Sequence, residues 1–206
     1  MKENTAEITS RIIHPNILYY GTPVLLLSTL NEDHSTNITP ISSSWALGDC
    51  IVLGLGVESK AFENISQLGE CVLNIPHPPL WQHVEKLAHY TGKNPVPEYK
   101  RKIGFQLEKD KFRASGLTPV PSQSVKPERI KECPIQIEAR IQHIRIPEHT
   151  SFFSIVETQA VHVHVHENII LRDNYINPER WSPLIYNFRH YFALGKQLGK
   201  TFRAET

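Results

Sequence analysis

The stretch that decides the fold is PIQIEARIQHIRI, residues 134–146, followed after a short gap by FFSIVETQAVHVHVH, residues 152–166. From Ile135 to Ile141 an apolar residue occupies every second position, which is typical of a strand with one buried face. Ile144 falls on the other parity, which predicts a β-bulge near Gln142–His143. The second stretch predicts another long strand or one arm of a bent hairpin.

Shorter strands are predicted on the N-terminal side of this pair, at residues 23–30, 50–57 and 71–75. Within 50–57, Gly54 and Gly56 lie on one face, where the missing side chain lets a ligand or another backbone approach. Residues 37–44 contain Pro40, which confines them to a sheet edge or to a departing loop.

Few helices are expected. Ser59 has the features of an N-cap for a helix that runs to Gly69, and residues 80–90 carry the apolar stripe of a short amphipathic helix. Residues 181–203 mix aromatic with basic residues and are expected to be partly helical. Residues 91–133 have no clear period and predict a long excursion with short elements. Many short strands with two or three small helices favour a β-barrel.

Charge and cysteine content exclude several classes of protein. Lysine plus arginine count 22 against 21 aspartate plus glutamate, and this balance argues against a nucleic-acid binder. Cys50, Cys71 and Cys133 provide no disulfide framework and no paired metal-binding spacing, so small buried side chains are expected. The N-terminal residues show no signal peptide, and no apolar run approaches the ~20 residues of a membrane span. We therefore expect a soluble, cytoplasmic protein.

Three motifs could bind a ligand, and each has a plainer interpretation. Ser59-Lys60 at a helix start suits a phosphate, but capped helices with a solvated lysine are common. The hydroxyl-rich run 39–45 suits a ligand close to the backbone, or is a serine-rich turn. His162, His164 and His166 share one strand face and could bind zinc or iron, or face solvent or a dimer partner. No Rossmann, P-loop or nucleophile-elbow motif is present.

The order of the sequence segments is similar to that of a known family. The segments are NITPISSSWAL (37–47), SKAFENISQLGECVLNIP (59–76), KIGFQLEKDKFRASGLTPVPS (102–122), VKPERIKECPIQIEA (125–139) and PERWSPLIYNFRHYFALGKQLGKTFR (178–203). Together they resemble the flavin reductase-like family with the FMN-binding split barrel. The resemblance implies a mainly β fold with a few short helices, built on a six-stranded antiparallel split β-barrel. It also implies a homodimer and one flavin reductase-like domain over residues 1–206, with the excursion at about 91–133.

The resemblance also assigns candidate site residues. It implies that FMN contacts Thr39, Pro40, Ile41, Ser42, Ser43, Ser44, Ser59, Lys60 and Asn64. The run 39–45 would follow the isoalloxazine ring, and Ser59 with Lys60 would hold the phosphate. Ala61 stands where many relatives have threonine, so one phosphate-binding hydroxyl is missing. His149 and Tyr191 match positions on the nicotinamide side and are the candidate catalytic residues.

The function implied by the resemblance is an FMN-binding flavoprotein that acts as an NAD(P)H-dependent flavin reductase, with NAD(P)H as co-substrate. The isoalloxazine carries the reactive chemistry, so no acid–base pair is required. Two alternatives remain open at this point. One is a non-enzymatic, flavoredoxin-like FMN carrier whose partner is a monooxygenase or another electron acceptor. The other, less favoured, is a metal-binding β-barrel that uses the face of His162, His164 and His166.

Overall fold

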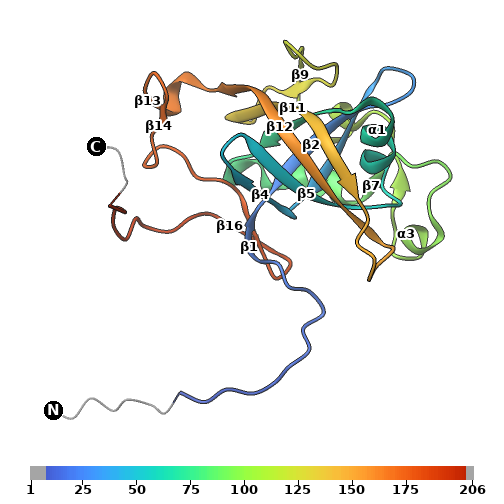
Figure 1. Cartoon of the computed structure of the whole chain (residues 1–206), viewed down its shortest axis with the longest axis horizontal. Helices are drawn as coiled ribbons and strands as arrows, with labels where there is room; N and C mark the ends of the chain where they lie inside the picture. Colours follow the sequence, from blue (N-terminus) through green and yellow to red (C-terminus); the bar gives the residue numbers. More distant parts are fainter. Residues whose placement is uncertain (1–7, 203–206) are drawn as a thin grey trace.

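The two long strands predicted from the sequence lie at the centre of a seven-stranded antiparallel sheet that curls into an open barrel (Figure 1). The structure is a computed structural model, and it describes residues 8–202. In the sheet the strand order is β3-β2-β6-β11-β12-β5-β4. The strands are β2 (Leu25–Leu30), β3 (Thr36–Ile41), β4 (Ser44–Leu47), β5 (Cys50–Gly56), β6 (Glu70–Ile75), β11 (Ile135–Arg145) and β12 (Phe153–Val165).

The predicted bulge in β11 is confirmed. The pairing of β11 with β12 shifts register between Ile141 and His143, and again between Glu138 and Ala139. β11 also pairs with β6, and β12 also pairs with β5. The hairpin of β11 and β12 therefore joins the two halves of the sheet. Register shifts of this kind bend a strand, which lets a flat hairpin follow the wall of a barrel.

The mainly β split-barrel prediction is confirmed, with differences in strand number and strand bounds. The main sheet has seven strands rather than six, because the short strand β4 adds to the outside of β5. The strand predicted over residues 23–30 is β2, which begins at Leu25. Pro23 is the last residue of β1 (Tyr20–Pro23), which belongs to a separate sheet with β15. β3 is an edge strand, as its proline requires.

Both predicted helices are present. α1 (Lys60–Leu68) begins after Ser59, whose hydroxyl oxygen accepts the Phe62 N–H at 3.1 Å, and ends at Gly69 with φ at 66°. α2 (Trp81–Ala88) follows the short 3₁₀ turn η1 (Pro78–Leu80). None of the helices within residues 8–202 is long and apolar enough to span a lipid bilayer.

The excursion has short elements, as predicted. They are β7 (Tyr90–Thr91), α3 (Glu98–Lys102), β8 (Gln106–Leu107), α4 (Lys111–Ser115), β9 (Pro119–Val120) and β10 (Arg129–Ile130). β7 pairs with β8, and β9 pairs with β10. The part after α4 is fixed to the barrel by the buried Glu138, whose carboxylate accepts the N–H groups of Gln123 at 2.8 Å and Ser124 at 2.6 Å.

The expectation of helix in residues 181–203 is wrong for the described part, which ends at residue 202. This part has the hairpin of β15 (Ile185–Asn187) and β16 (His190–Phe192), while η2 (Glu167–Ile169), β13 (Ile170–Arg172) and β14 (Tyr175–Ile176) precede it. Phe188 and Arg189 take positive φ angles of 44° and 69°, as the two central residues of a tight hairpin turn. β15 also pairs with β1, and this partner from the other end of the chain fixes the segment as strand.

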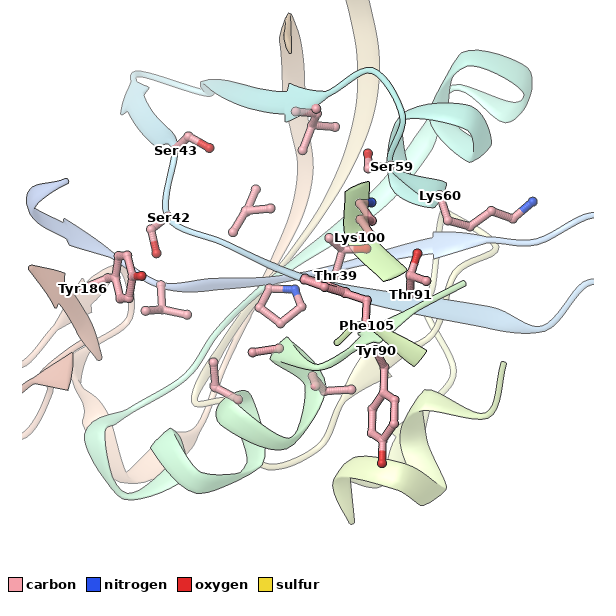
Figure 2. Close-up of a pocket in the computed structure, with 18 of the residues that line it drawn as sticks. Thr39, Ser42, Ser43, Ser59, Lys60, Tyr90, Thr91, Lys100, Phe105 and Tyr186 are labelled. Atoms are coloured by element: carbon pink, nitrogen blue, oxygen red, sulfur yellow. The ribbon is translucent and has the colours of Figure 1, made fainter. Parts of the chain in front are cut away.

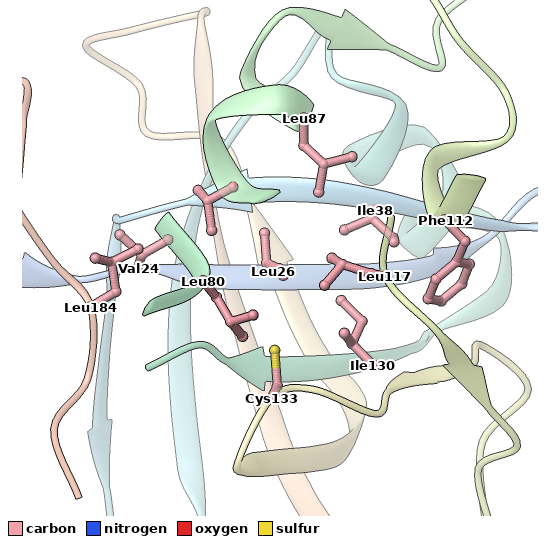
Figure 3. Packing of buried hydrophobic residues seen from close by; sticks show 11 residues of the cluster. Val24, Leu26, Ile38, Leu80, Leu87, Phe112, Leu117, Ile130, Cys133 and Leu184 are labelled. Carbon is pink, nitrogen blue, oxygen red and sulfur yellow. The ribbon is translucent and has the colours of Figure 1, made fainter. Parts of the chain in front are cut away.

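The core consists of two clusters on the two faces of the sheet. Leu25 and Leu27 pack inside the barrel with Ile65 of α1, and Cys71 is buried there too. Leu26 points to the other face, into a cluster covered by α2 and α4 that also buries Cys133 (Figure 3). Burial on both faces explains why β2 begins with three consecutive leucines, Leu25 to Leu27, rather than with alternating apolar and polar residues.

Candidate functional site

A cavity of about 410 Å³ lies beside β3, with the N-terminus of α1 and the excursion on its rim (Figure 2). Three segments that are distant in sequence provide its polar groups. The first is residues 39–43, which include the end of β3 and the two residues that follow it. The second is Ser59 and Lys60 at the start of α1, and the third is within residues 90–111 of the excursion. Tyr19, Tyr186 and Tyr191 line it as well.

The start of α1 gives one end of the cavity a positive potential. A helix N-terminus presents unpaired N–H groups and the positive end of the helix dipole, which favour an anion. The Lys60 ammonium lies 2.5 Å from Oε1 of Glu63, and the same carboxylate accepts from Lys93. These two hydrogen bonds lower the pKa of Glu63. The charge of Lys60 is therefore partly balanced within the chain.

Gly92 lies against this end. A Cβ atom at position 92 would lie 2.7 Å from Oδ1 of Asn37 and 3.1 Å from Cγ of Lys60. Such contacts are too short, so a side chain here would displace the groups that shape the cavity. The glycine keeps the excursion close to the start of α1.

Of the hydroxyl-rich run 39–45, residues 39–43 line the cavity wall. Thr39 Oγ1 accepts from the Asn37 amide at 3.1 Å. The Ser43 hydroxyl donates to the Gly54 carbonyl at 2.7 Å, and the Gly54 N–H donates to the Ser43 carbonyl at 2.7 Å. A Cβ on Gly54 would lie 3.0 Å from Cβ of Ser43. The close approach expected at Gly54 is thus made by the chain's own backbone.

Lys111 of α4 is a cavity residue that the sequence reasoning missed. Its side chain is only 2% exposed, and its ammonium donates to the carbonyls of Ile38 at 3.3 Å and Tyr90 at 3.4 Å. Among residues 8–202, Lys111 forms no salt bridge with a carboxylate. Burial lowers its pKa to about 8; Glu108 opposes this shift and Lys100 adds to it. The cavity thus borders a buried ammonium that has no carboxylate partner within the described part of the chain.

The excursion supplies a second lysine to the cavity. Lys100 Nζ lies 5.8 Å from the ring centroid of Tyr99 and 5.9 Å from that of Phe105, distances suited to cation–π contacts. Its ammonium also donates to the Glu58 carbonyl at 3.4 Å, and burial lowers its pKa. Asp110 and Gly116, which cap α4 at its two ends, are the sequence signals that would have located that helix.

Three tyrosines in edge-to-face and tilted contact form the other end of the cavity. The ring centroids of Tyr19 and Tyr186 are 5.5 Å apart, and those of Tyr186 and Tyr191 are 5.7 Å apart. The Tyr191 hydroxyl donates to Oε2 of Glu85 on α2 at 3.0 Å, and burial together with this carboxylate raises the pKa of Tyr191. Tyr191 therefore lines the cavity, while its hydroxyl is hydrogen-bonded to Glu85 of α2.

Most of the predicted site residues meet at this cavity. It is lined by Thr39, Pro40, Ile41, Ser42, Ser43, Ser59, Lys60 and Tyr191. Ser44 lies outside its lining, on β4. Asn64 lies on the buried face of α1, where its side-chain amide donates to Oγ1 of Thr29 and Oδ1 of Asn31. His149 is exposed in the turn between β11 and β12, also outside the lining.

The three histidines of residues 162–166 are hydrogen-bonded, two of them to the excursion and His164 to β11. The imidazoles of His162, His164 and His166 form hydrogen bonds with the Ser124 hydroxyl at 2.8 Å, the Glu138 carboxylate at 2.7 Å and the Lys131 carbonyl at 3.0 Å. In the part of the chain that the structure describes, no group of three or more histidine, cysteine or carboxylate side chains is arranged to hold a metal ion. These contacts favour a structural role for the histidine face.

The fold is an open antiparallel barrel, and its cavity is lined by residues 39–43, the start of α1 and several tyrosines. This architecture is that of the split-barrel proteins. Residues 17–195 match the sequence model of the flavin reductase like domain. The match covers most of the chain, so this protein belongs to the flavin reductase-like family, and a flavin-related oxidoreductase function follows.

The chain is also similar to a curated relative and to solved structures. The uncharacterized protein YdfE of Bacillus subtilis (strain 168) is 59% identical over 194 residues, 94% of each chain. The flavoredoxin of Desulfovibrio vulgaris (Miyazaki F) superposes with a TM-score of 0.78 at 25% identity, over 95% of this chain and 99% of that one. Nitrilotriacetate monooxygenase component B from Bacillus cereus shares the fold, with a TM-score of 0.73 at 17% identity over 94% and 100% of the chains.

Proposed function

We propose that this protein binds FMN in the cavity and acts as an NAD(P)H-dependent flavin reductase. The observation that carries the proposal is the cavity itself, which has a basic end at the start of α1 and aromatic side chains at the other end. A ligand with a phosphate at one end and a planar ring at the other fits this distribution. Bound FMN supplies the isoalloxazine ring that accepts a hydride.

The basic end suits a terminal phosphate. The N-terminal N–H groups of α1 and the ammonium groups of Lys60 and Lys111 provide donors and positive charge. Lys60 is partly neutralised by Glu63, whereas Lys111 has no carboxylate partner among the described residues. A buried cation without a partner is costly, and a phosphate would remove that cost.

The wall formed by residues 39–43 would hold the ring. Pro40 and Ile41 offer apolar contact, and the neighbouring backbone offers hydrogen bonds to the polar edge of a flavin. Stacking against a fixed wall orients the ring for the nucleotide and excludes water from one face. We assign orientation of the nicotinamide to His149 and Tyr191, following the family resemblance.

A second candidate function is that of an FMN electron carrier, and the likeness to a flavoredoxin favours it. In that case the reducing equivalents come from a protein, and the acceptor is another protein. Two of the solved structures that share the fold are titled nitrilotriacetate monooxygenase component B, which suggests a monooxygenase as such a partner. We also propose that residues 1–206 act as one domain and that the protein is a homodimer.

The test is oxidation of NADH and NADPH by the purified protein with free FMN, followed at 340 nm. Flavin-dependent oxidation of either nucleotide supports the reductase, and yellow protein without oxidation supports the carrier. Protein that neither retains FMN nor uses it as a substrate would contradict both functions. FAD and riboflavin serve as comparison ligands, because only FMN ends in a phosphate monoester.

A further inference from the structure

Residues 92–110, which we call the lid, form the first part of the excursion and contain no buried residue. α3 lies within the lid, and Figure 1 shows it on a loop at the edge of the molecule. The second part of the excursion, residues 111–133, differs because Phe112, Leu117 and Ile130 are buried in the core. A segment without core contacts opens locally at a lower free energy than a segment that is packed in the core. The excursion therefore combines a weakly held part with a fixed part.

The lid is attached to the rest of the chain through polar groups. β8 pairs with β7 over only two residues of each strand. Further attachments run to the region where α1 begins, since the Lys93 ammonium pairs with Glu63 and the Lys100 ammonium donates to the Glu58 carbonyl at 3.4 Å. Polar contacts close to the surface contribute little to stability. They hold the lid in place without locking it.

The lid also forms one wall of the cavity. Tyr99, Lys100 and Phe105 belong to the lining, and Figure 2 shows Lys100 and Phe105 among the side chains around the cavity. Lys100 is partly buried, and within residues 8–202 it forms no salt bridge with a carboxylate. With the lid in place, a cation of the excursion therefore lies in the cavity wall.

Like charges gather near the basic end of the cavity when the lid is in place. Lys111 belongs to the fixed part of the excursion, whereas Lys93 and Lys100 belong to the lid, and Glu63 balances part of the charge of Lys93. Burial lowers the pKa of Lys100; Glu58 opposes this shift and Lys93 adds to it. Lys100 in turn adds to the lowering of the Lys111 pKa by burial. Repulsion among these ammonium groups favours an open lid in the free protein, and an anion in the cavity offsets that repulsion.

We propose that the lid opens in the free protein and is closed over the cavity by the phosphate of the bound ligand, which pairs with Lys100. Its ends are Gly92 and Asp110, and the Asp110 carboxylate caps α4 by accepting the Arg113 N–H at 3.1 Å, where the fixed part begins. A ligand shifts such an equilibrium only if it binds the two states differently, and the phosphate meets Lys100 only when the lid is closed. An opening lid lets flavin exchange with the solution, so FMN serves as an exchangeable substrate rather than a permanently bound group. This inference rests on the proposed function, because it takes FMN as the ligand.

Hydrogen–deuterium exchange of the full chain, resolved by peptide mass spectrometry, tests the lid. We expect peptides from residues 92–110 to exchange fast in the free protein and about tenfold more slowly at saturating FMN. Peptides from residues 111–133 should exchange slowly in both states and serve as the internal reference. A lid that exchanges as slowly as this reference in the free protein overturns the proposal, and so does a lid whose exchange is unchanged by saturating FMN.

Lys100→Met and its control Lys102→Met test the closing contact. Methionine removes the charge and keeps an unbranched side chain of similar length. In Lys100→Met we expect the lid to exchange fast even with FMN bound, and FMN to dissociate about tenfold faster in a stopped-flow fluorescence measurement. Lys102 is exposed and pairs with Glu98 inside the lid, so Lys102→Met should match wild type in both measurements. Wild-type protection and dissociation in Lys100→Met would overturn the proposal.

Inorganic phosphate separates a failure of the lid from a failure of the proposed function. It carries the closing group without the flavin, so a high phosphate concentration should slow the exchange of residues 92–110 in wild type and not in Lys100→Met. If the protein does not bind FMN, the proposed function fails and the phosphate measurement decides the lid by itself. Slowed exchange then supports the lid, and unchanged exchange overturns it.

Discussion

The ammonium of Lys111 lies 3.3 Å from the backbone carbonyl of Ile38, on the free edge of β3. This contact fastens the excursion to the barrel and places a buried positive charge beside the cavity. A carbonyl offers only a partial negative charge, so the phosphate of the proposed FMN would add the full negative charge that this ammonium lacks among the described residues. Lys111 thus makes a hydrogen bond that holds α4 to β3, and its positive charge has no carboxylate partner among the described residues.

Lys111→Met should weaken FMN binding by tenfold or more and leave the free protein as stable as before or more stable. Methionine fills a similar volume, and it removes a buried charge that has no counter-ion. The measurements are FMN titration and thermal unfolding of the same preparation. Lys102→Met, at an exposed lysine of α3, is the matched control and should change neither. A large loss of stability in Lys111→Met with unchanged FMN affinity would show a purely structural lysine.

The pKa of Lys111 also predicts how FMN affinity depends on pH. Its folded-state pKa is lowered from 10.5 to about 8, and an anionic ligand binds only the protonated amine. FMN affinity should therefore decrease as pH rises above about 8, and Lys111→Met should remove this decrease. The stability of the free protein has the opposite slope: between about 8 and 10.5 the unfolded chain binds more protons, so stability rises with pH. Titrations at pH 7, 8 and 9 on both proteins give the comparison.

Lys60→Ala should weaken FMN binding by about 1–2 kcal/mol, the range of a hydrogen bond to a charged group. The shared carboxylate of Glu63 already balances part of this charge, so the effect should be smaller than that of Lys111→Met. Calorimetric titration of the two variants against wild type tests this order. Unchanged affinity in Lys60→Ala would remove Lys60 from the phosphate site.

Gly92→Ala should reduce both stability and FMN affinity. The added methyl group meets Asn37 at 2.7 Å and Lys60 at 3.1 Å, and overpacking of this kind costs about 1–3 kcal/mol. Gly199→Ala is the control, because a Cβ at that position has no neighbour within 4 Å. Denaturant unfolding and flavin titration of both variants are the measurements. A Gly92→Ala protein that matches wild type in both would mean that the segment moves aside freely.

His149→Ala and Tyr191→Phe should keep FMN bound and lower the reductase kcat/KM by roughly tenfold, about 1.4 kcal/mol of transition-state stabilisation. For Tyr191 the change removes only the hydroxyl that donates to Glu85, while the ring keeps its place in the wall. Steady-state kinetics are compared with flavin occupancy and melting temperature. Flavin lost in step with activity, or wild-type kinetics in both variants, would contradict the assignment.

Glu138→Gln should destabilise the protein by about 2–3 kcal/mol at neutral pH, because a buried carboxylate that accepts two backbone N–H groups becomes a neutral amide. These hydrogen bonds, together with that from His164, lower the pKa of Glu138 against the opposing effect of burial. The stability it contributes is therefore present above its unfolded pKa and is lost as pH falls through the folded value. Unfolding at pH 7 and pH 4 should show a difference between wild type and variant that shrinks at low pH. Glu167→Gln, at an exposed site, is the control.

The strands and their faces could be predicted from the sequence because they depend on local patterns. Alternation over residues 135–141 and its change of parity predict both β11 and its bulge, since side chains on a strand alternate between faces. Ser59 and Gly69 predict the ends of α1, because capping acts within a few residues. The segment order of the family then predicts the barrel and places residues 39–43 beside the start of α1.

The buried charge of Lys111 beside the cavity was decided by tertiary structure alone. Lys111 lies between Asp110 and Phe112 in the sequence, and no local pattern predicts that its side chain is buried. α4 packs it against β3 and excludes water from it. The hairpin of β15 and β16 is strand because β1, from the other end of the chain, pairs with it. Burial and strand pairing depend on contacts between distant residues, and local sequence patterns do not contain them.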